Sequence, residues 1–166
     1  MRRLVPFACT LVTFAAWQQG LVVAAGNPKH IESVQDLANP NVIMINRQTG
    51  SGSRSLLDRL LNQQGIPPTA LTGYGREAGG HLAVARAVAT GLADVGIGVQ
   101  AAASALGLGF VPLEEERYDL VIPNHFLDDP AVRPLLDLLR QPGLRHRIEA
   151  LGGYDVSGMG EPAPAG

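Results

Sequence analysis

Several residue types that build common functional sites are scarce in this chain. Its one cysteine, Cys9, excludes an internal disulfide and any metal site made of several thiolates. Aromatic residues make up only 5% of the sequence, too few for a surface that stacks nucleobases or sugars. The four histidines lack the spacing of metal ligands, so we expect no zinc site. The net charge of −2 supplies no positive field for nucleic acid or an anionic membrane, and any affinity for anions has to be local.

Hydrophobic residues are plentiful by comparison, at 46% of the 166 positions, which is enough for the core of one domain. Predicted strands cover 42–45, 71–74, 94–99, 110–113 and 120–123, and predicted helices cover 33–37, 54–64, 81–90, 100–106, 130–140 and 143–151. This alternation predicts an α/β fold with a mostly parallel sheet and helices on both faces. An acidic turn at 114–116 joins the last two strands, and Gly96 and Gly98 indicate close approach of a neighbour to their strand. Residues 1–156 are expected to form one domain, followed by a disordered Gly-, Pro- and Ala-rich tail at 157–166.

The first 25 residues support two interpretations. A basic start, an apolar run to Trp17 and the sequence Val23–Ala25 imitate a secretory signal peptide and its cleavage site. Alternatively, 11–14 and 21–23 are strands of the fold, joined by a turn at 18–20. The pattern alone does not separate these interpretations, and the family resemblance given below favours strands. Strands go with a cytoplasmic protein, whereas a signal peptide would make the protein exported or periplasmic. The apolar run is too short and too interrupted for a membrane-spanning helix.

Glycine and hydroxyl residues are concentrated just after the predicted strand at 42–45. The segment Asn46–Arg54 reads Asn-Arg-Gln-Thr-Gly-Ser-Gly-Ser-Arg and leads into a helix. Such a turn directs free backbone N–H groups and the positive end of the helix dipole at one spot, which attracts an anion. Arg47 and Arg54 can add charge-assisted hydrogen bonds. The glycine spacing fits neither the P-loop nor the dinucleotide fingerprint, so we expect a small anion rather than a nucleotide.

Structural roles are the alternative for the same residues. Ser53 can simply cap the helix, and either arginine can pair with Asp58 or Glu77. A second Gly-rich turn, at 75–81, ends at His81 and precedes the next helix. Because ligands bind at the carboxyl ends of parallel strands, we expect both turns to face one cleft.

Several segments together resemble a known family. The matching motifs are 19–23 with 26–28, 46–48 with 50–54, 81–85 with 91–96, 116–123, and 151–155. Over about residues 10–158 the chain resembles periplasmic-binding-protein-like (class II solute-binding) domains of the molybdate and tungstate type. Such domains occur beside helix-turn-helix regulators or molybdopterin-biosynthesis domains. The resemblance implies a two-lobed fold with the ligand between the lobes, in which the first lobe is incomplete and the second complete.

The loop and the resemblance together predict a set of ligand-binding residues. They are Asn46, Arg47, Gln48, Ser51, Gly52, Ser53, Arg54, His81 and Tyr118. Tyr118 enters through the resemblance, because related binding proteins place a tyrosine near this return strand. We expect no metal and no cofactor, a small anion as ligand, no direct binding of nucleic acid or membrane, and a partner domain of the kinds named above. A homo-oligomer is left open.

The predicted function is binding of a small oxyanion, molybdate or tungstate, in a sensory, regulatory or transport role and without catalysis. A vestigial interaction or oligomerisation module without ligand is the alternative. A hydrolase is a third class, with Ser51 or Ser53 as nucleophile and His81 as base. The tight sequence Gly50–Gly52 lacks the spacing of a nucleophile elbow, which argues against it.

Overall fold

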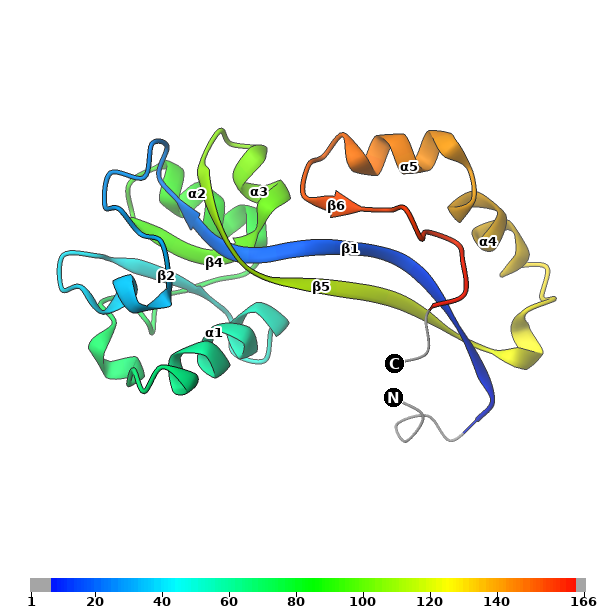
Figure 1. Cartoon of the computed structure of the whole chain (residues 1–166), viewed down its shortest axis with the longest axis horizontal. Coiled ribbons are helices and arrows are strands. Elements are labelled where there is room, and N and C mark those ends of the chain that lie inside the picture. The colour runs from blue at the N-terminus through cyan, green and yellow to red at the C-terminus, as the bar shows by residue number, and fades with distance from the viewer. Residues whose placement is uncertain (1–6, 164–166) are drawn as a thin grey trace. The chain divides into compact units, whose positions relative to one another are not determined.

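Strands β1 and β5 are the longest elements of the fold and run beside each other (Figure 1). The computed structural model describes residues 7–163, in which the strands pair in the order β3-β2-β4-β1-β5 and β6 also pairs with β1. The elements are β1 (Cys9–Val23), η1 (Val34–Ala38), β2 (Met44–Arg47), α1 (Gly52–Gln63), η2 (Pro68–Ala70), β3 (Glu77–Ala78), α2 (His81–Ala89), β4 (Val95–Val99), α3 (Gln100–Ser104), β5 (Gly109–Pro123), η3 (Asn124–Phe126), α4 (Arg133–Leu139), α5 (Pro142–Glu149) and β6 (Tyr154–Asp155). Contacts divide the chain into unit 1 (Met1–Trp17 and Glu116–Gly166) and unit 2 (Gln18–Glu115). Both long strands contribute residues to each unit.

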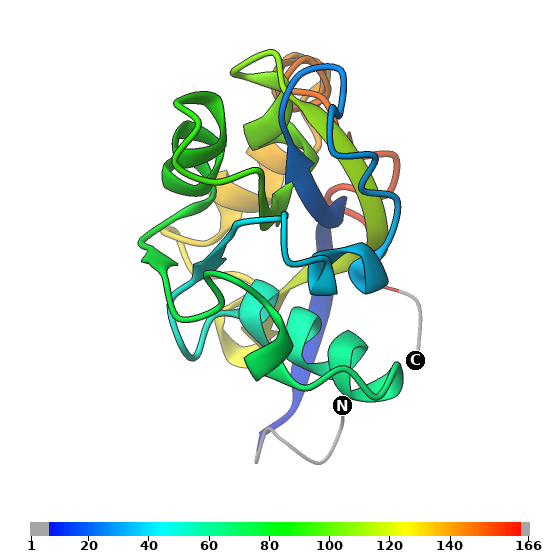
Figure 2. The ribbon, with the colours of Figure 1, turned by 90° about the vertical axis from the view of Figure 1, so that its left-hand side faces the viewer.

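The sheet is mixed rather than mostly parallel. Strand β2 pairs in parallel with β3 and with β4, whereas β1 pairs antiparallel with β4 and with β6. In unit 2, α1 covers one face of the sheet, and α2 and α3 cover the other (Figure 2). The predicted α/β class with helices on both faces is therefore confirmed, and only the share of parallel pairs was overestimated.

Strand β4 shows why α2 lies so close to the sheet of unit 2. Its Val95 and Ile97 are fully buried in the core cluster that also contains Leu57 of α1. On the opposite face a Cβ at Gly96 would collide with Val84 of α2. Alternation along the strand thus gives one face large side chains and the other face glycines. The close approach predicted from these glycines is confirmed.

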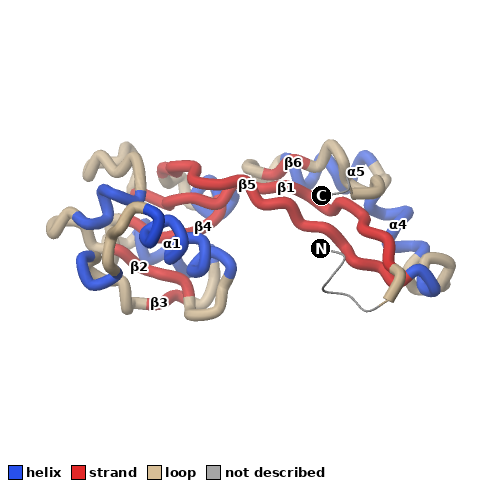
Figure 3. Tube along the Cα trace, turned by 60° about the horizontal axis from the view of Figure 1, so that its bottom comes forward, coloured by secondary structure: helices blue, strands red, loops and turns tan. Residues whose placement is uncertain are grey.

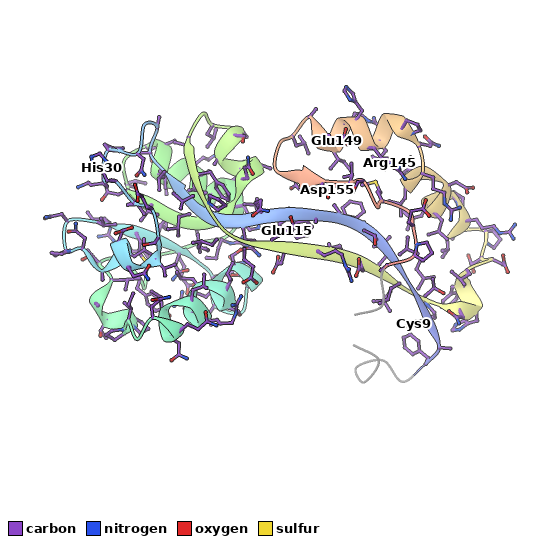
Figure 4. The ribbon with its side chains drawn as sticks, in the orientation of Figure 1. Cys9, His30, Glu115, Arg145, Glu149 and Asp155 are labelled. Carbon is purple, nitrogen blue, oxygen red and sulfur yellow. The ribbon has the colours of Figure 1, made fainter. Side chains whose placement is uncertain are left out.

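Unit 1 has a separate core built on the other ends of the long strands. Val12 of β1 and Ile122 of β5 are buried with Leu139 and Met159. Arg145 of α5, labelled in Figure 4, donates to the backbone carbonyl of Met159 and so connects this helix to the segment after β6. Helices α4 and α5 and strand β6 complete the described part of this unit.

The segment after residue 156 is ordered through residue 163, contrary to the predicted tail. Met159 is fully buried, and the Thr13 N–H donates to the Glu161 carbonyl at 2.9 Å. Val12 and Pro162 form an isolated antiparallel bridge. Composition suggested disorder, but an apolar anchor and the free edge of β1 hold the segment in place. The rest of the predicted tail, 164–166, lies outside the described residues.

The turn expected at 18–20 does not form, because Cys9–Val23 is one continuous strand. A Cβ at Gly20 would collide with the Val111 carbonyl oxygen of β5. Gly20 therefore serves close strand packing rather than a change of chain direction.

The acidic turn expected at 114–116 is also absent, since these residues lie inside β5. Glu114 pairs with Arg59 of α1, with 2.6 Å between Nη2 and Oε2. The run of carboxylates therefore belongs to a partly exposed strand with a basic partner, and not to a loop.

The strand predicted at 71–74 is replaced by a turn followed by the short strand β3. Gly73 has a φ of 90°, which favours glycine, and a Cβ there would collide with the Met44 carbonyl oxygen. Strand β2 begins at Met44, later than predicted, and it includes Asn46 and Arg47, which pair with β3. In the described part of the chain, no helix combines the length and the apolar character needed to cross a membrane.

Candidate functional site

The loop from β2 into α1 is closed by Ser51, which is the N-cap of the helix. Its hydroxyl accepts a hydrogen bond from the Arg54 N–H at 3.3 Å, and the helix begins at Gly52. Ser53 lies inside the first turn, so the alternative that made it the cap was wrong. Ser53 is 3% exposed, and its hydroxyl makes no hydrogen bond to any other described residue.

Backbone donors remain free at this helix start. The N–H groups of Gly52 and Ser53 donate to no acceptor within residues 7–163, whereas the Ser51 N–H closes a turn onto the Gln48 carbonyl at 3.2 Å. The first N–H groups of a helix have no intrahelical partner and carry the positive end of its dipole. The start of α1 therefore offers donors and partial positive charge.

Arg47 is the most unusual charged residue of the site. It ends β2, is only 9% exposed and makes no ion pair with a carboxylate in the described part of the chain. Its Nε donates to the Gln48 side-chain oxygen at 3.2 Å, and its Nη1 lies 2.9 Å from Nδ1 of His81. Burial lowers the pKa of the Arg47 guanidinium, because desolvation disfavours the charged form. The site thus holds a buried positive charge whose two side-chain partners are both uncharged.

His81 brings the second Gly-rich turn to the same place. It is the first residue of α2, whose N-cap, Gly80, provides no side-chain hydrogen bond. Strands β2 and β3 lie side by side (Figure 3), which places the helix that follows β3 next to Arg47. Burial, together with the charge of Arg47, lowers the pKa of His81 to about 4. The imidazole is therefore neutral at physiological pH.

Arg54 differs from Arg47 because its charge is compensated within the protein. Its Nε lies 3.2 Å from Asp58 and its Nη1 lies 3.6 Å from Glu77. Its guanidinium also lies over the ring of Tyr74, 4.0 Å from the centroid. The predicted alternative, a pair with Asp58 or Glu77, holds for Arg54 and not for Arg47.

The remaining predicted residues of the loop have structural partners. Asn46 is fully buried, donates from Nδ2 to the Tyr74 carbonyl at 3.3 Å and accepts the Arg47 N–H at 3.0 Å. Gln48 orients Arg47, as described above. Tyr74 was missed by the sequence analysis, because nothing in its own segment signals contact with a helix that precedes it in the chain.

Tyr118 and this loop belong to different units. It belongs to unit 1, is 53% exposed, and stacks on Trp17 with 5.4 Å between ring centroids. Phe14 contacts the same ring edge-on at 6.2 Å. The site built from Arg47, His81 and the start of α1 lies wholly in unit 2.

The hydrolase alternative finds no support in the geometry. No hydrogen bond joins Ser51 or Ser53 to His81 among the described residues, and Nδ1 of His81 faces Arg47. A serine nucleophile needs a base within hydrogen-bond reach. Residues 7–163 contain no cluster of three or more His, Cys, Asp or Glu side chains that could hold a metal ion.

Comparisons with known proteins identify the family. A profile described as the PBP superfamily domain matches residues 1–140. The uncharacterized protein YvgK of Bacillus subtilis (strain 168) is 34% identical over 151 residues, which cover 91% of this chain and 48% of YvgK. The chain therefore spans about half the length of this relative.

Solved structures with the same fold include proteins described as substrate-binding. One is described as the substrate-binding domain of a molybdenum ABC transporter from Clostridium difficile, with a TM-score of 0.64, 15% identity, and coverage of 88% of this chain and 66% of that chain. Another is described as a phosphate ABC transporter substrate-binding protein with bound phosphate from Clostridium perfringens, with a TM-score of 0.61, 10% identity, and coverage of 88% and 71%. With the profile match over most of its length, the chain belongs to the PBP superfamily domain family.

Proposed function

We propose that the chain binds a small tetrahedral oxyanion at Arg47 and the adjoining N-terminus of α1. The observation that carries the proposal is the burial of Arg47, a residue 9% exposed, whose guanidinium has two side-chain partners that are both neutral. A charge removed from water without a counter-charge is costly. A bound anion supplies that counter-charge, whereas water in the same place does not.

The groups around Arg47 suit an oxyanion. The free N–H groups of Gly52 and Ser53, and the unpartnered Ser53 hydroxyl, are hydrogen-bond donors at a helix start. A guanidinium presents a planar fork of donors that matches two oxygens of one anion. Recognition in this way needs no metal and no transfer of a chemical group.

Molybdate or tungstate is the ligand that we propose within this class. The motifs quoted above support it, as does the fold shared with a protein described as part of a molybdenum transporter. The fold shared with a phosphate-binding protein makes phosphate the first competitor to examine. We propose a sensory, regulatory or substrate-binding role, exerted on a helix-turn-helix or molybdopterin-biosynthesis domain as in the relatives that the motifs resemble.

Isothermal titration calorimetry tests the proposal directly. The whole chain is titrated with molybdate, tungstate, sulfate and phosphate at low ionic strength, and at least one anion should bind in a one-to-one ratio. Arg47→Gln should reduce the affinity by roughly 100-fold, because a charge-assisted contact to a desolvated anion is lost.

Arg59→Gln is the matched control. Arg59 lies on the same helix, but it is exposed and pairs with Glu114 rather than with the loop. This variant should bind like the original protein. Absence of heat from every anion would contradict the proposal, and a stable oligomer without anion affinity on size-exclusion chromatography would favour the vestigial interaction module instead.

A further inference from the structure

We infer that His81 is the positioning residue of this site, which holds Arg47 with a neutral acceptor and so leaves its positive charge available to the ligand. The inference rests on the proposed function and adds a role for a second side chain. It starts from one distance, the 2.9 Å between Nη1 of Arg47 and Nδ1 of His81.

The chemistry of the two side chains assigns the hydrogen. A guanidinium has donors and no acceptor, so in this pair Nδ1 of His81 has to accept. A neutral imidazole carries one hydrogen, which must then lie on Nε2. His81 is therefore fixed in one tautomer, with Nδ1 as acceptor and Nε2 as a further donor.

Neutrality of this acceptor is essential to the inference. A carboxylate in the same place would hold Arg47 equally well but would cancel its charge, as Asp58 and Glu77 do for Arg54. A neutral histidine accepts a hydrogen bond from the guanidinium and leaves the charge of Arg47 uncompensated. The comparison between the two arginines thus separates a structural cation from one kept for a ligand.

The surroundings of His81 keep it neutral. The elements packed against α2 are β2, β3, β4 and α3. Among them β2 contributes Arg47 and β3 contributes Glu77, an exposed residue, while β4 and α3 carry no ionisable side chain. On α2 the other charged residue is Arg86, which is also exposed. The charged group in contact with His81 is the Arg47 guanidinium, which would repel a protonated imidazole.

Three substitutions at one position test the role. In His81→Asn, Oδ1 takes the place of Nδ1 on the same γ carbon, so a neutral acceptor for Arg47 is kept. In His81→Asp the acceptor is kept but becomes charged. In His81→Ala the acceptor is lost. The first residue of a helix tolerates all three substitutions, and an aspartate there is favourable for helix stability.

The inference predicts an order of sulfate and molybdate affinities that a merely structural role would not produce. The Asn variant should bind within about threefold of the original protein, the Ala variant roughly tenfold more weakly, and the Asp variant at least tenfold more weakly still. Equal affinities for the Ala variant and the original protein would overturn the inference. So would an Asp variant that binds as well as the Asn variant.

Nitrogen-15 NMR of the histidine side chains provides a readout that needs no ligand. With His81→Asn used to assign the resonance, His81 should show a protonated Nε2 and an unprotonated Nδ1 from about pH 5.5 to 8. A protonated Nδ1 would overturn the inference even if anions bind. Conversely, the expected tautomer in a protein that binds none of the anions would contradict the proposed function and leave the Arg47–His81 arrangement standing.

Discussion

Arg54 lies over the ring of Tyr74, with its guanidinium carbon 4.0 Å from the ring centroid, and both side chains donate to the same oxygen of Asp58. The Tyr74 hydroxyl lies 2.7 Å from that oxygen and the Arg54 Nε lies 3.2 Å from it. Burial, and then the hydrogen bond to Asp58, raise the pKa of Tyr74. Helix α1 is thus attached to the turn after η2 by a charged group that is already paired.

Tyr74→Phe should therefore lower the stability of the fold without changing ligand binding. The ring and its contact with Arg54 remain, but a hydrogen bond to a carboxylate is lost. We expect the free energy of unfolding, measured by urea denaturation, to fall by about 1–2 kcal/mol. Anion affinity should change little. Tyr118→Phe, at an exposed position, serves as the control for loss of a tyrosine hydroxyl. A Tyr74→Phe variant that loses anion binding as completely as Arg47→Gln would place the Arg54 cluster in the ligand site.

Arg47→Met should separate stability from binding. The substitution removes a buried charge that has no carboxylate partner, although it also removes the hydrogen bonds to Gln48 and His81. Replacement of such a charge by an apolar side chain of similar length is often neutral or stabilising by about 1–2 kcal/mol. Thermal unfolding should show an unchanged or higher midpoint, while calorimetry shows no anion binding. A midpoint many degrees lower would mean that Arg47 is needed for the fold itself.

The pH dependence of stability should report on His81. Its pKa is about 4 in the folded protein and ordinary, near 6.5, in the unfolded chain, so the unfolded chain binds more protons between these values. Stability is therefore complete above about pH 6.5 and declines as the pH falls towards 4. Because the side chain is partly exposed, the slope should be well below the limit of about 1.4 kcal/mol per pH unit. Urea denaturation of His81→Asn over the same range should lack this part of the decline; parallel curves for the two proteins would contradict the assignment.

Gly96→Ala should test how closely α2 approaches the sheet. A Cβ at this position would collide with Val84 and would lie 2.9 Å from the Ile45 carbonyl oxygen. Backbone cannot yield as a flexible side chain does, so we expect a loss of about 1–3 kcal/mol in the free energy of unfolding. Gly79→Ala is the control, because a Cβ there meets nothing within 4 Å and should change stability by no more than about 0.5 kcal/mol. Equal effects of the two substitutions would show that α2 can shift away without cost.

The alternation of apolar segments and glycines was sufficient to predict the class of fold and most helices. Predictions from local patterns were wrong where the structure around a residue depends on a neighbour that is distant in the sequence. Gly20 was interpreted as part of a turn because glycine is common in turns, but it lies in a strand that the Val111 carbonyl approaches. The acidic residues of β5 were interpreted as a turn because their basic partner, Arg59, lies on another element. Met159 likewise orders a segment whose composition predicts disorder.

The candidate site was likewise predicted only in part. The sequence predicted that Arg47 and Arg54 would lie beside a helix start, and both do. It did not distinguish between them, because the difference depends on which side chains arrive from later segments. Asp58 is one helical turn from Arg54, whereas His81 is 34 residues from Arg47 and reaches it only through the pairing of β2 with β3.

Gly80 leaves the start of α2 without a side-chain cap. Its backbone is extended, at a φ of 178°, and a Cβ there would meet nothing within 4 Å, which favours a small side chain such as serine. A serine hydroxyl would cap α2 and add about 1 kcal/mol of stability. That hydroxyl would accept a hydrogen bond from an N–H group of α2, whereas the donors proposed for the ligand are the N–H groups of Gly52 and Ser53 at the start of α1. Position 80 therefore offers a way to stabilise the domain that leaves those ligand donors unoccupied.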